Sequence, residues 1–394
     1  MERFFRCFDN PGALLALVVM LLMSLGTVMM FSASGARAGL ESMRVQAQAE
    51  SRAEEDFRIH HGDSYLRRQV MWGVVGLLAA AVAFRFPLER LENLAMPILV
   101  VSMVLLVLVV ASPLGVTAKG ATRWLAVGPF TIQPSEFAKI GMVIYMAKYL
   151  ADRREEMRSF LRGFLPSVIV LGIFSILIVL EKDLGTIVVM GVVVAGMWCL
   201  ARVRVWHLAS LVALAMPALV FLVFQHSYRL HRILAILDPE KYASTYGLQL
   251  NQSLIAVGSG GLFGTGLGQS IQKYHFLPEA HTDFVYAIVC EELGLMGGLS
   301  VAILFLAFVF LGFAIAYRAH DYFSSLMATG LTLIIGCGAF INIFVVLGLA
   351  PTKGLPLPFF SYGGSSLVAT LICVGLLMNI ANDSLARRGS REEF

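Results

Sequence analysis

Acidic side chains and a histidine stand close together at the start of a long apolar segment, in the stretch 277–294. Asp283 lies at the centre of this group, with Glu279 and His281 shortly before it. A positioned carboxylate can act as the general base that takes a proton from an attacking hydroxyl. A charge near a hydrocarbon core costs about 2.5 to 3.5 kcal/mol, so its presence there indicates a functional site. The alternative is that Asp283 only caps a helix beginning at Phe284.

A second pair of charges lies at the start of another apolar segment. Glu136 and Lys139 are three residues apart, so on a helix they lie on one face and can form an ion pair. A charged pair inside a span must face protein or water, because lipid cannot solvate it. We interpret the pair first as a structural salt bridge, with a direct catalytic role as the alternative.

Composition decides the class of protein. The 394 residues are 58% hydrophobic and 14% charged, and the mean hydropathy is +0.78, which excludes a soluble globule. Apolar runs of span length therefore predict an all-α integral membrane protein. The net charge of +4 comes from basic residues spread between these runs, so no nucleic-acid partner is expected. The five cysteines are isolated and predict neither disulfides nor a metal site.

The apolar runs predict about ten transmembrane helices in a single polytopic domain, 1–394, with short tails at about 1–10 and 383–394. The first helix is expected to be retained, because no cleavage pattern follows it. The predicted spans are 11–33, 69–86, 94–112, a span of about 16 residues after Pro134, 164–180, 184–201, 208–225, 297–317, 322–347 and 366–380.

The connections between the spans carry the unusual residues. The stretch 34–68 is too charged to enter lipid, and its part 43–57 is predicted to form a surface helix. The stretch 113–135 is predicted to be a loop, and Glu181, Lys182 and Asp183 form the tip of a helical hairpin. The large connection 226–282, between spans seven and eight, is amphipathic at 229–237 and dense in glycine at 258–268. These glycines favour a re-entrant loop packed against protein over a nucleotide site.

Basic residues predict the orientation. Arg and Lys on the side of the termini are concentrated in tails and short turns, where the positive-inside rule applies. Both termini are therefore expected in the cytoplasm. The unusual loops, including 349–366, would then share one polar basin on the external side.

Several motifs together resemble the SEDS family of bacterial peptidoglycan glycosyltransferases, and the resemblance covers nearly all the predicted helices. The motifs are GATRW at 120–124, QPSE at 133–136, DLGT at 183–186, LPEAHTDF at 277–284, EELG at 291–294, KGLPLP at 353–358 and SYGGSS at 361–366. Ala280 and QSIQK at 269–273 are similar to the cell-division type, FtsW, more than to the elongation type, RodA. Two features depart from the pattern: Glu181-Lys182 where the family often has Gln-Pro, and a long first external loop.

The resemblance implies an enzyme that polymerises lipid II into glycan strands at the outer face of the bacterial cytoplasmic membrane, at the division septum. Asp283 would be the general base. Arg123, Lys139 and Lys353 would stabilise the leaving pyrophosphate. A divalent cation such as Mg²⁺ is the one candidate cofactor. The sequence does not indicate which residues would bind it. Further candidates for substrate binding are Glu136, Glu279, His281, Gln249, Gln252, Ser253, Ser361 and Ser365. For Gln249, Gln252 and Ser253, plain packing of the loop is the alternative.

The implied partners are lipid II, the growing glycan strand, a class B penicillin-binding transpeptidase and other membrane proteins of cell division. An elongation polymerase of the RodA type is the nearest alternative. A lipid II flippase is another, although it should carry charges deep in several helices and often an internal repeat. A non-catalytic scaffold of the division machinery would not need Asp283.

Overall fold

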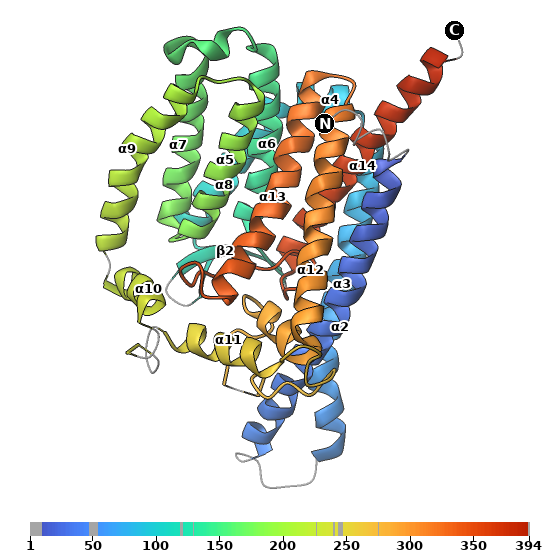
Figure 1. Cartoon of the computed structure of the whole chain (residues 1–394), viewed down its shortest axis with the longest axis vertical. Coiled ribbons are helices and arrows are strands. Elements are labelled where there is room, and N and C mark those ends of the chain that lie inside the picture. Colours follow the sequence, from blue (N-terminus) through green and yellow to red (C-terminus); the bar gives the residue numbers. More distant parts are fainter. Residues whose placement is uncertain are drawn as a thin grey trace.

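The computed structural model describes residues 10–392, except 47–53, 119–120, 129, 226, 239–240, 243–246 and 275. Long helices lie side by side in one bundle (Figure 1). The start of α2 (Pro11–Gln46) and the end of α14 (Gly364–Glu392) lie at the same end of the bundle, while the irregular segments gather at the opposite end (Figure 1). The expected placement of both termini on one side agrees with this arrangement.

A long helix lies at each of the predicted span positions. Besides α2 and α14, they are α3 (Glu54–Arg85), α5 (Ala95–Ala111), α6 (Pro134–Asp152), α7 (Leu165–Leu180), α8 (Leu184–Leu200), α9 (Val205–Phe224), α12 (Val285–Arg318) and α13 (Tyr322–Val346). Within the described residues, six helices are long and apolar enough to cross a membrane, and three more apolar helices are shorter. The mostly helical membrane fold is thus confirmed, and the count of ten spans stays a prediction.

Shorter helices lie in the connections: α4 (Leu88–Asn93), η1 (Glu156–Arg158), η2 (Phe160–Phe164), α10 (Ser227–Leu237) and α11 (Leu248–Ser259). The stretch 229–237, which is amphipathic in sequence, lies in α10. The most extensive contacts between helices are those of α14 with α3 and of α12 with α13, followed by those of α5 with α6 and of α12 with α2. Helix α13 also packs on α6, α8 and α14, so it runs through the inside of the bundle.

The prediction for the first connection was wrong in part. Instead of a separate surface helix at 43–57, α2 continues to Gln46 and α3 already begins at Glu54. The segment is rich in Ala, Glu, Arg and Gln, which all favour helix, so the spans extend beyond their apolar parts. Residues 47–53 lie outside the described part of the chain.

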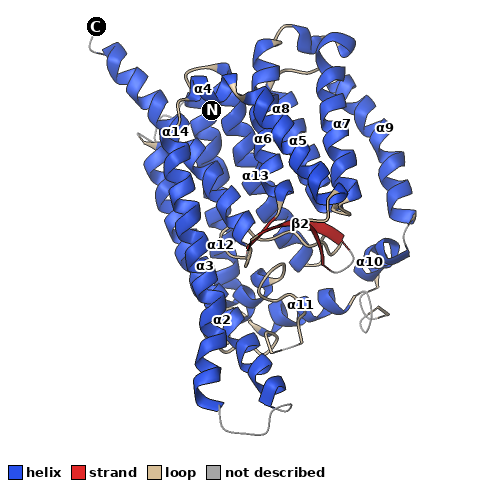
Figure 2. Ribbon diagram, turned by 180° about the vertical axis from the view of Figure 1, so that it is seen from behind, coloured by secondary structure: helices blue, strands red, loops and turns tan. Residues whose placement is uncertain are grey.

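The stretch 113–135 is also more ordered than predicted. It forms a three-stranded antiparallel sheet of β1 (Gly115–Ala118), β2 (Ala121–Val127) and β3 (Phe130–Ile132), in the order β1-β2-β3. Val116 pairs with Trp124 and Leu125 pairs with Ile132, which suits the preference of β-branched and aromatic residues for strands. The sheet lies at the loop end of the bundle, near α10 and α11 (Figure 2).

A break separates the Asp283 segment from the predicted eighth span, 297–317. Helix α12 is interrupted at Gly294, where φ is 69° and ψ is −168°. The glycine-dense stretch fills this break, because Leu295 N–H donates to the Gly261 carbonyl at 2.9 Å and Met296 N–H to the Leu262 carbonyl at 3.2 Å. A Cβ on Gly264 would collide with the carbonyl of Glu292. The glycines therefore permit close packing of backbone on backbone, as the re-entrant interpretation predicts.

Candidate functional site

The residues before α12 form a tight turn that ends at Asp283. Glu279 has a φ of 61°, and its carbonyl accepts from the N–H groups of Thr282 at 3.1 Å and Phe284 at 3.2 Å. Because of this turn, the helix begins only after Phe284, which occupies the N-cap position. The alternative that Asp283 caps a helix beginning at Phe284 was wrong, because Asp283 lies one residue before the cap.

The carboxylate of Asp283 lies against the backbone of the loop 351–363. A Cβ placed on Gly354 would be only 2.8 Å from Oδ2 of Asp283, so glycine leaves the space that the carboxylate uses. Asp283 is half-buried, and Gly354 is exposed. Lys353, the next residue in the chain, brings a candidate cation to the same loop.

A buried asparagine on α13 joins the two segments. Nδ2 of Asn342 donates to the carbonyl of Asp283 and to the carbonyl of Leu355, both at 2.7 Å. Asn342 is 1% exposed, so these bonds form away from water. Sequence reasoning missed this residue, and the available signal was a single amide side chain inside an otherwise apolar span.

Ser361 and His281 strengthen the same junction. The Ser361 hydroxyl donates to the carbonyl of Thr282 and accepts from the N–H of Leu357 at 2.7 Å. The N–H of Tyr362 donates to the carbonyl of His281 at 3.0 Å. Both candidates are buried, so their contacts position the Asp283 segment on the loop.

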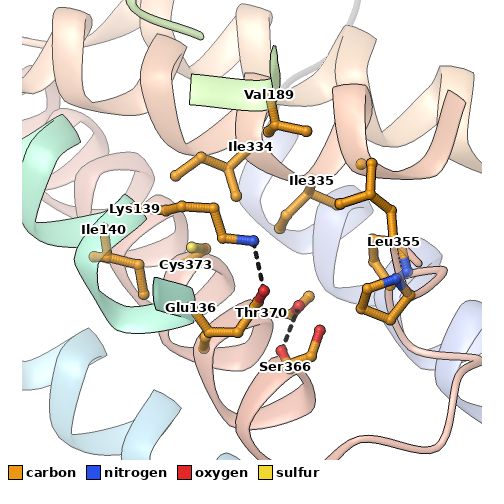
Figure 3. A pocket seen from close by; sticks show the side chains of 14 residues that line it. Glu136, Lys139, Ile140, Val189, Ile334, Ile335, Leu355, Ser366, Thr370 and Cys373 are labelled. Carbon is orange, nitrogen blue, oxygen red and sulfur yellow. Dashed lines mark hydrogen bonds and ion pairs between the residues drawn. The ribbon is translucent and has the colours of Figure 1, made fainter. Parts of the chain in front are cut away.

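Glu136 and Lys139 form the ion pair that their spacing predicts. Nζ of Lys139 lies 2.8 Å from Oε1 of Glu136, and the side chains are 11% and 6% exposed, respectively. Figure 3 shows the pair pointing into a pocket beside Thr370, whose hydroxyl donates to the carbonyl of Ser366. The remaining lining residues come mainly from α6, α13, α14 and the loop: Ile140, Val189, Ile334, Ile335, Gly338, Leu355, Pro356, Pro358, Ala369 and Cys373.

This pocket adjoins the Asp283 segment through one loop. Leu355 lines the pocket, while its carbonyl shares the Asn342 amide with Asp283. Ser365 ties the start of α14, just after the loop, to the N-cap of α6, because its hydroxyl accepts from the N–H of Gln133 at 3.0 Å. The structure therefore brings the candidates around Asp283 and the Glu136–Lys139 pair to the two faces of the same loop.

Breaking the Glu136–Lys139 pair should destabilise the protein. Glu136→Ala or Lys139→Ala leaves a mostly buried charge without its partner, which should cost on the order of 1 to 3 kcal/mol. The double replacement should recover part of this loss. Thermal melting of the three variants measures the effect, and strictly additive losses would show that the two side chains do not stabilise each other.

Arg123 is held at the tip of the α7–α8 hairpin. Its Nε donates to the carbonyl of Glu181 at 3.3 Å and its Nη2 to the carbonyl of Lys182 at 2.6 Å. Lys182 has a φ of 59°, which proline cannot adopt, so this tip differs from a Gln-Pro turn. The tip lies near the loop, because a Cβ on Gly185 would be 3.1 Å from Leu355.

Glu181 is an unusual carboxyl in this tip. It is fully buried, and neither of its carboxyl oxygens has a hydrogen-bond partner among the residues that the structure describes. Burial, reinforced by Asp183 and opposed by Arg123, raises the pKa of Glu181 to about 8. The side chain is therefore mostly protonated at neutral pH.

Glu181→Gln should remove a pH dependence of stability. With a folded pKa of about 8 and an ordinary value of 4.5, the folded state keeps a proton that the unfolded state loses. The free energy of unfolding should therefore fall as pH rises from 4.5 to 8 in the parent, and fall less in the variant. Melting temperatures from about pH 5 to about pH 9 measure this slope. Glu155→Gln, at an exposed glutamate, is the control; equal slopes in all three proteins would contradict the prediction.

The remaining candidates lie at the edge of the site. Gln249 and Gln252 are half-buried on α11. Ser253 is fully buried, and its hydroxyl donates to the carbonyl of Val346 at 2.8 Å, so it is engaged within the protein. Oε2 of Glu279 accepts from the hydroxyl of Thr282 at 2.9 Å.

A divalent cation does not find a ready set of ligands. In the part of the chain that the structure describes, no three His, Cys, Asp or Glu side chains gather closely enough to hold a metal ion. Hard cations such as Mg²⁺ are usually bound through carboxylates. The described residues therefore do not offer the carboxylate set that Mg²⁺ prefers.

The chain has clear relatives in sequence. The model of the FtsW, RodA and SpoVE group, described as cell cycle protein, matches residues 12–385. A probable peptidoglycan glycosyltransferase FtsW from Geobacter metallireducens is 43% identical over 324 residues, which cover 82% of this chain and 86% of the relative.

Solved structures share the fold. One, of a peptidoglycan synthase complex that coordinates polymerization and crosslinking, is similar with a TM-score of 0.73 and 27% identity, covering 94% of this chain and 97% of the other. The rod shape determining protein RodA from Thermus thermophilus is similar with a TM-score of 0.65 and 27% identity, covering 94% and 96%.

Proposed function

Because the chain belongs to the FtsW, RodA and SpoVE family of cell cycle proteins, we propose that it is a peptidoglycan glycosyltransferase of the cell-division type. It joins lipid II units into glycan strands. The observation that carries the proposal is the Asp283 carboxylate, held against Gly354 at the mouth of an apolar helix, in a chain whose relatives bear this activity in their names.

The proposed reaction needs one base and one leaving group. Asp283 takes the proton from the sugar hydroxyl of the acceptor while that oxygen forms a bond to the anomeric carbon of the donor. The bond from this carbon to the pyrophosphate oxygen breaks, and the lipid pyrophosphate leaves with the electron pair. The bonds of Asn342 and Ser361 to the backbone at 282–283 support a fixed position for the base.

Cations near the loop would stabilise the negative charge that grows on the pyrophosphate. Lys353 is the candidate nearest to Asp283 along the loop. Lys139 contributes through the pocket on the other face, where Glu136 orients its ammonium group. Arg123 acts mainly by positioning the hairpin tip, because two backbone carbonyls occupy its guanidinium.

The protein is an integral membrane protein of the bacterial inner membrane, as its apolar helices and its family indicate. We place the Asp283 end of the bundle outside the cytoplasm, and the protein at the septum. The similarity to a synthase complex that couples polymerization to crosslinking supports a transpeptidase of the class B penicillin-binding type as its partner.

Polymerisation by the purified protein tests the function. The protein in proteoliposomes, alone and with the transpeptidase, should convert lipid II into glycan polymer. Movement of lipid II across the bilayer without polymer would instead make the protein a flippase. If both samples show neither polymer nor movement of lipid II, the protein would be a non-catalytic scaffold.

Cysteine labelling tests the orientation. Lys241→Cys, at an exposed position between α10 and α11, should react with a membrane-impermeant reagent added outside intact cells. Ala386→Cys, exposed near the end of α14, should react only after the membrane is opened. The physical reason is the concentration of Arg and Lys in the short connections at the terminal end. The reverse pattern would overturn both the orientation and the external site.

A further inference from the structure

The glycine-dense stretch 260–274, called here the re-entrant loop, exposes large apolar side chains. Phe263 is 83% and Ile271 is 65% exposed, and Leu262 and Leu267 are exposed as well. Contiguous apolar surface of this kind marks a contact with membrane or protein. We propose that the re-entrant loop is a lipid anchor, whose apolar side chains insert into the bilayer surface at the Asp283 end of the bundle.

The loop lies beside the ends of the apolar parts of two helices, α2 and α12. Nζ of Lys273, near its end, lies 3.1 Å from the hydroxyl of Ser32, which is at the end of the apolar part of α2, Pro11–Ala33. At its start, the carbonyl of Leu262 accepts from the N–H of Met296 on α12. Both contacts place the loop beside the ends of spans, at the lower end of the bundle in Figure 1.

The exposed residues of the loop adjoin a row of exposed apolar side chains on α12. Met296, Leu299, Ile303 and Leu306 are all exposed, and their spacing of three and four residues puts them on one face of the helix. The exposed Leu262 lies next to this row, because its carbonyl accepts from the N–H of Met296 at 3.2 Å. The continuity of the two surfaces favours lipid as the occupant of both.

Many backbone N–H groups of the loop are bonded within the protein, as a lipid environment requires, while Oε1 of Gln272 is buried without a hydrogen-bond partner among the described residues. Carboxylate oxygens of Glu291 and Glu292 accept from the N–H groups of Gly268, Ser270, Ile271 and Gln272. The N–H groups of Thr265 and Gly266 donate to the carbonyls of Glu291 and Glu292 at 2.9 and 3.0 Å. A loop in water would not need this degree of internal pairing.

The loop also presents no charge at its surface. Its one charged residue, Lys273, has a side chain 3% exposed and lies 2.8 Å from Oε1 of Glu292. An exposed apolar face without unpaired charges is typical of segments that lie in the membrane interface. A polar protein surface would find no charge on the loop to pair with.

Fluorescence quenching tests the anchor in proteoliposomes without partner protein. A small probe is attached to Phe263→Cys, or to Leu267→Cys, in a chain whose five native cysteines are replaced. Lys241→Cys, exposed in the same connection but outside the loop, is the matched control. Melting temperatures establish that each variant is folded.

Bromine atoms on the lipid chains should quench the probes at 263 and 267, and aqueous iodide should quench them on the order of fivefold less than the control, because ions do not enter the interface. Strong iodide quenching without lipid quenching would overturn the proposal. Protection from iodide that appears only when the transpeptidase is added would assign the surface to a protein partner and would equally overturn it.

Discussion

Asp283→Asn should slow lipid II polymerisation by about 100 to 10,000 fold, the contribution expected of a positioned general base. Asparagine has nearly the size of aspartate and cannot take up the proton. The hydrogen bond from Asn342 goes to the carbonyl of residue 283 and so survives the replacement. The variant should therefore fold and enter the membrane like the parent.

The control for this experiment is Glu279→Gln, four residues earlier in the same turn. The bonds that shape this turn are accepted by the carbonyl of Glu279, and an amide can still accept from Thr282. Its polymerisation should stay near that of the parent, and thermal melting should be similar for all three proteins. Parent-like activity of the Asn variant would remove Asp283 from the mechanism and leave Glu279 or His281 as candidates.

Local sequence patterns predict the parts of this protein that depend on local physics. The spans follow from the length of the apolar runs, and the Glu136–Lys139 pair follows from helical spacing. The break at Gly294 follows from glycines in an otherwise helical stretch. In each of these cases the structural feature is determined by residues that are close together in the sequence.

The features that could not be predicted depend on distant contacts. Asn342 lies 59 residues from Asp283 in the chain, and Ser361 lies 79 residues from Thr282. No spacing rule connects such positions, so the clamp on the base is visible only in the fold. The sheet at 115–132 was missed for a related reason, because short strands gain their stability from pairing with one another.

The arrangement of Asp283 explains why these distant contacts are needed. The residue lies before the helix, in a turn outside the regular hydrogen bonding of α12. Asn342 and Ser361 bind its backbone, while Gly354 leaves room for its carboxylate. The backbone is thus fixed from α13 and from the loop, and the carboxylate stays half-buried at the surface of the site. Positioning of this kind is what a general base requires.

The re-entrant loop fixes α12 from the other side, through one buried ion pair. Nζ of Lys273 donates to Oε1 of Glu292 at 2.8 Å and to the carbonyl of Gly268 at 2.7 Å. The hydroxyl of Ser32 on α2 donates to the same carboxylate. Glu292 lies in the first part of α12, the helix that begins just after Asp283, so movement of this junction should disturb the base as well.

Lys273→Met should therefore destabilise the protein by about 3 to 5 kcal/mol, because it leaves the Glu292 carboxylate buried without its cation. Hydrogen exchange should rise first in 260–274, and polymerisation should fall with it. Lys273→Met combined with Glu292→Gln should lose less than the sum of the two single changes, since no buried charge then remains unpaired. Lys241→Met, at an exposed lysine of the same connection, should melt like the parent. If Lys273→Met melts and exchanges like Lys241→Met, the ion pair does not hold the loop on α12.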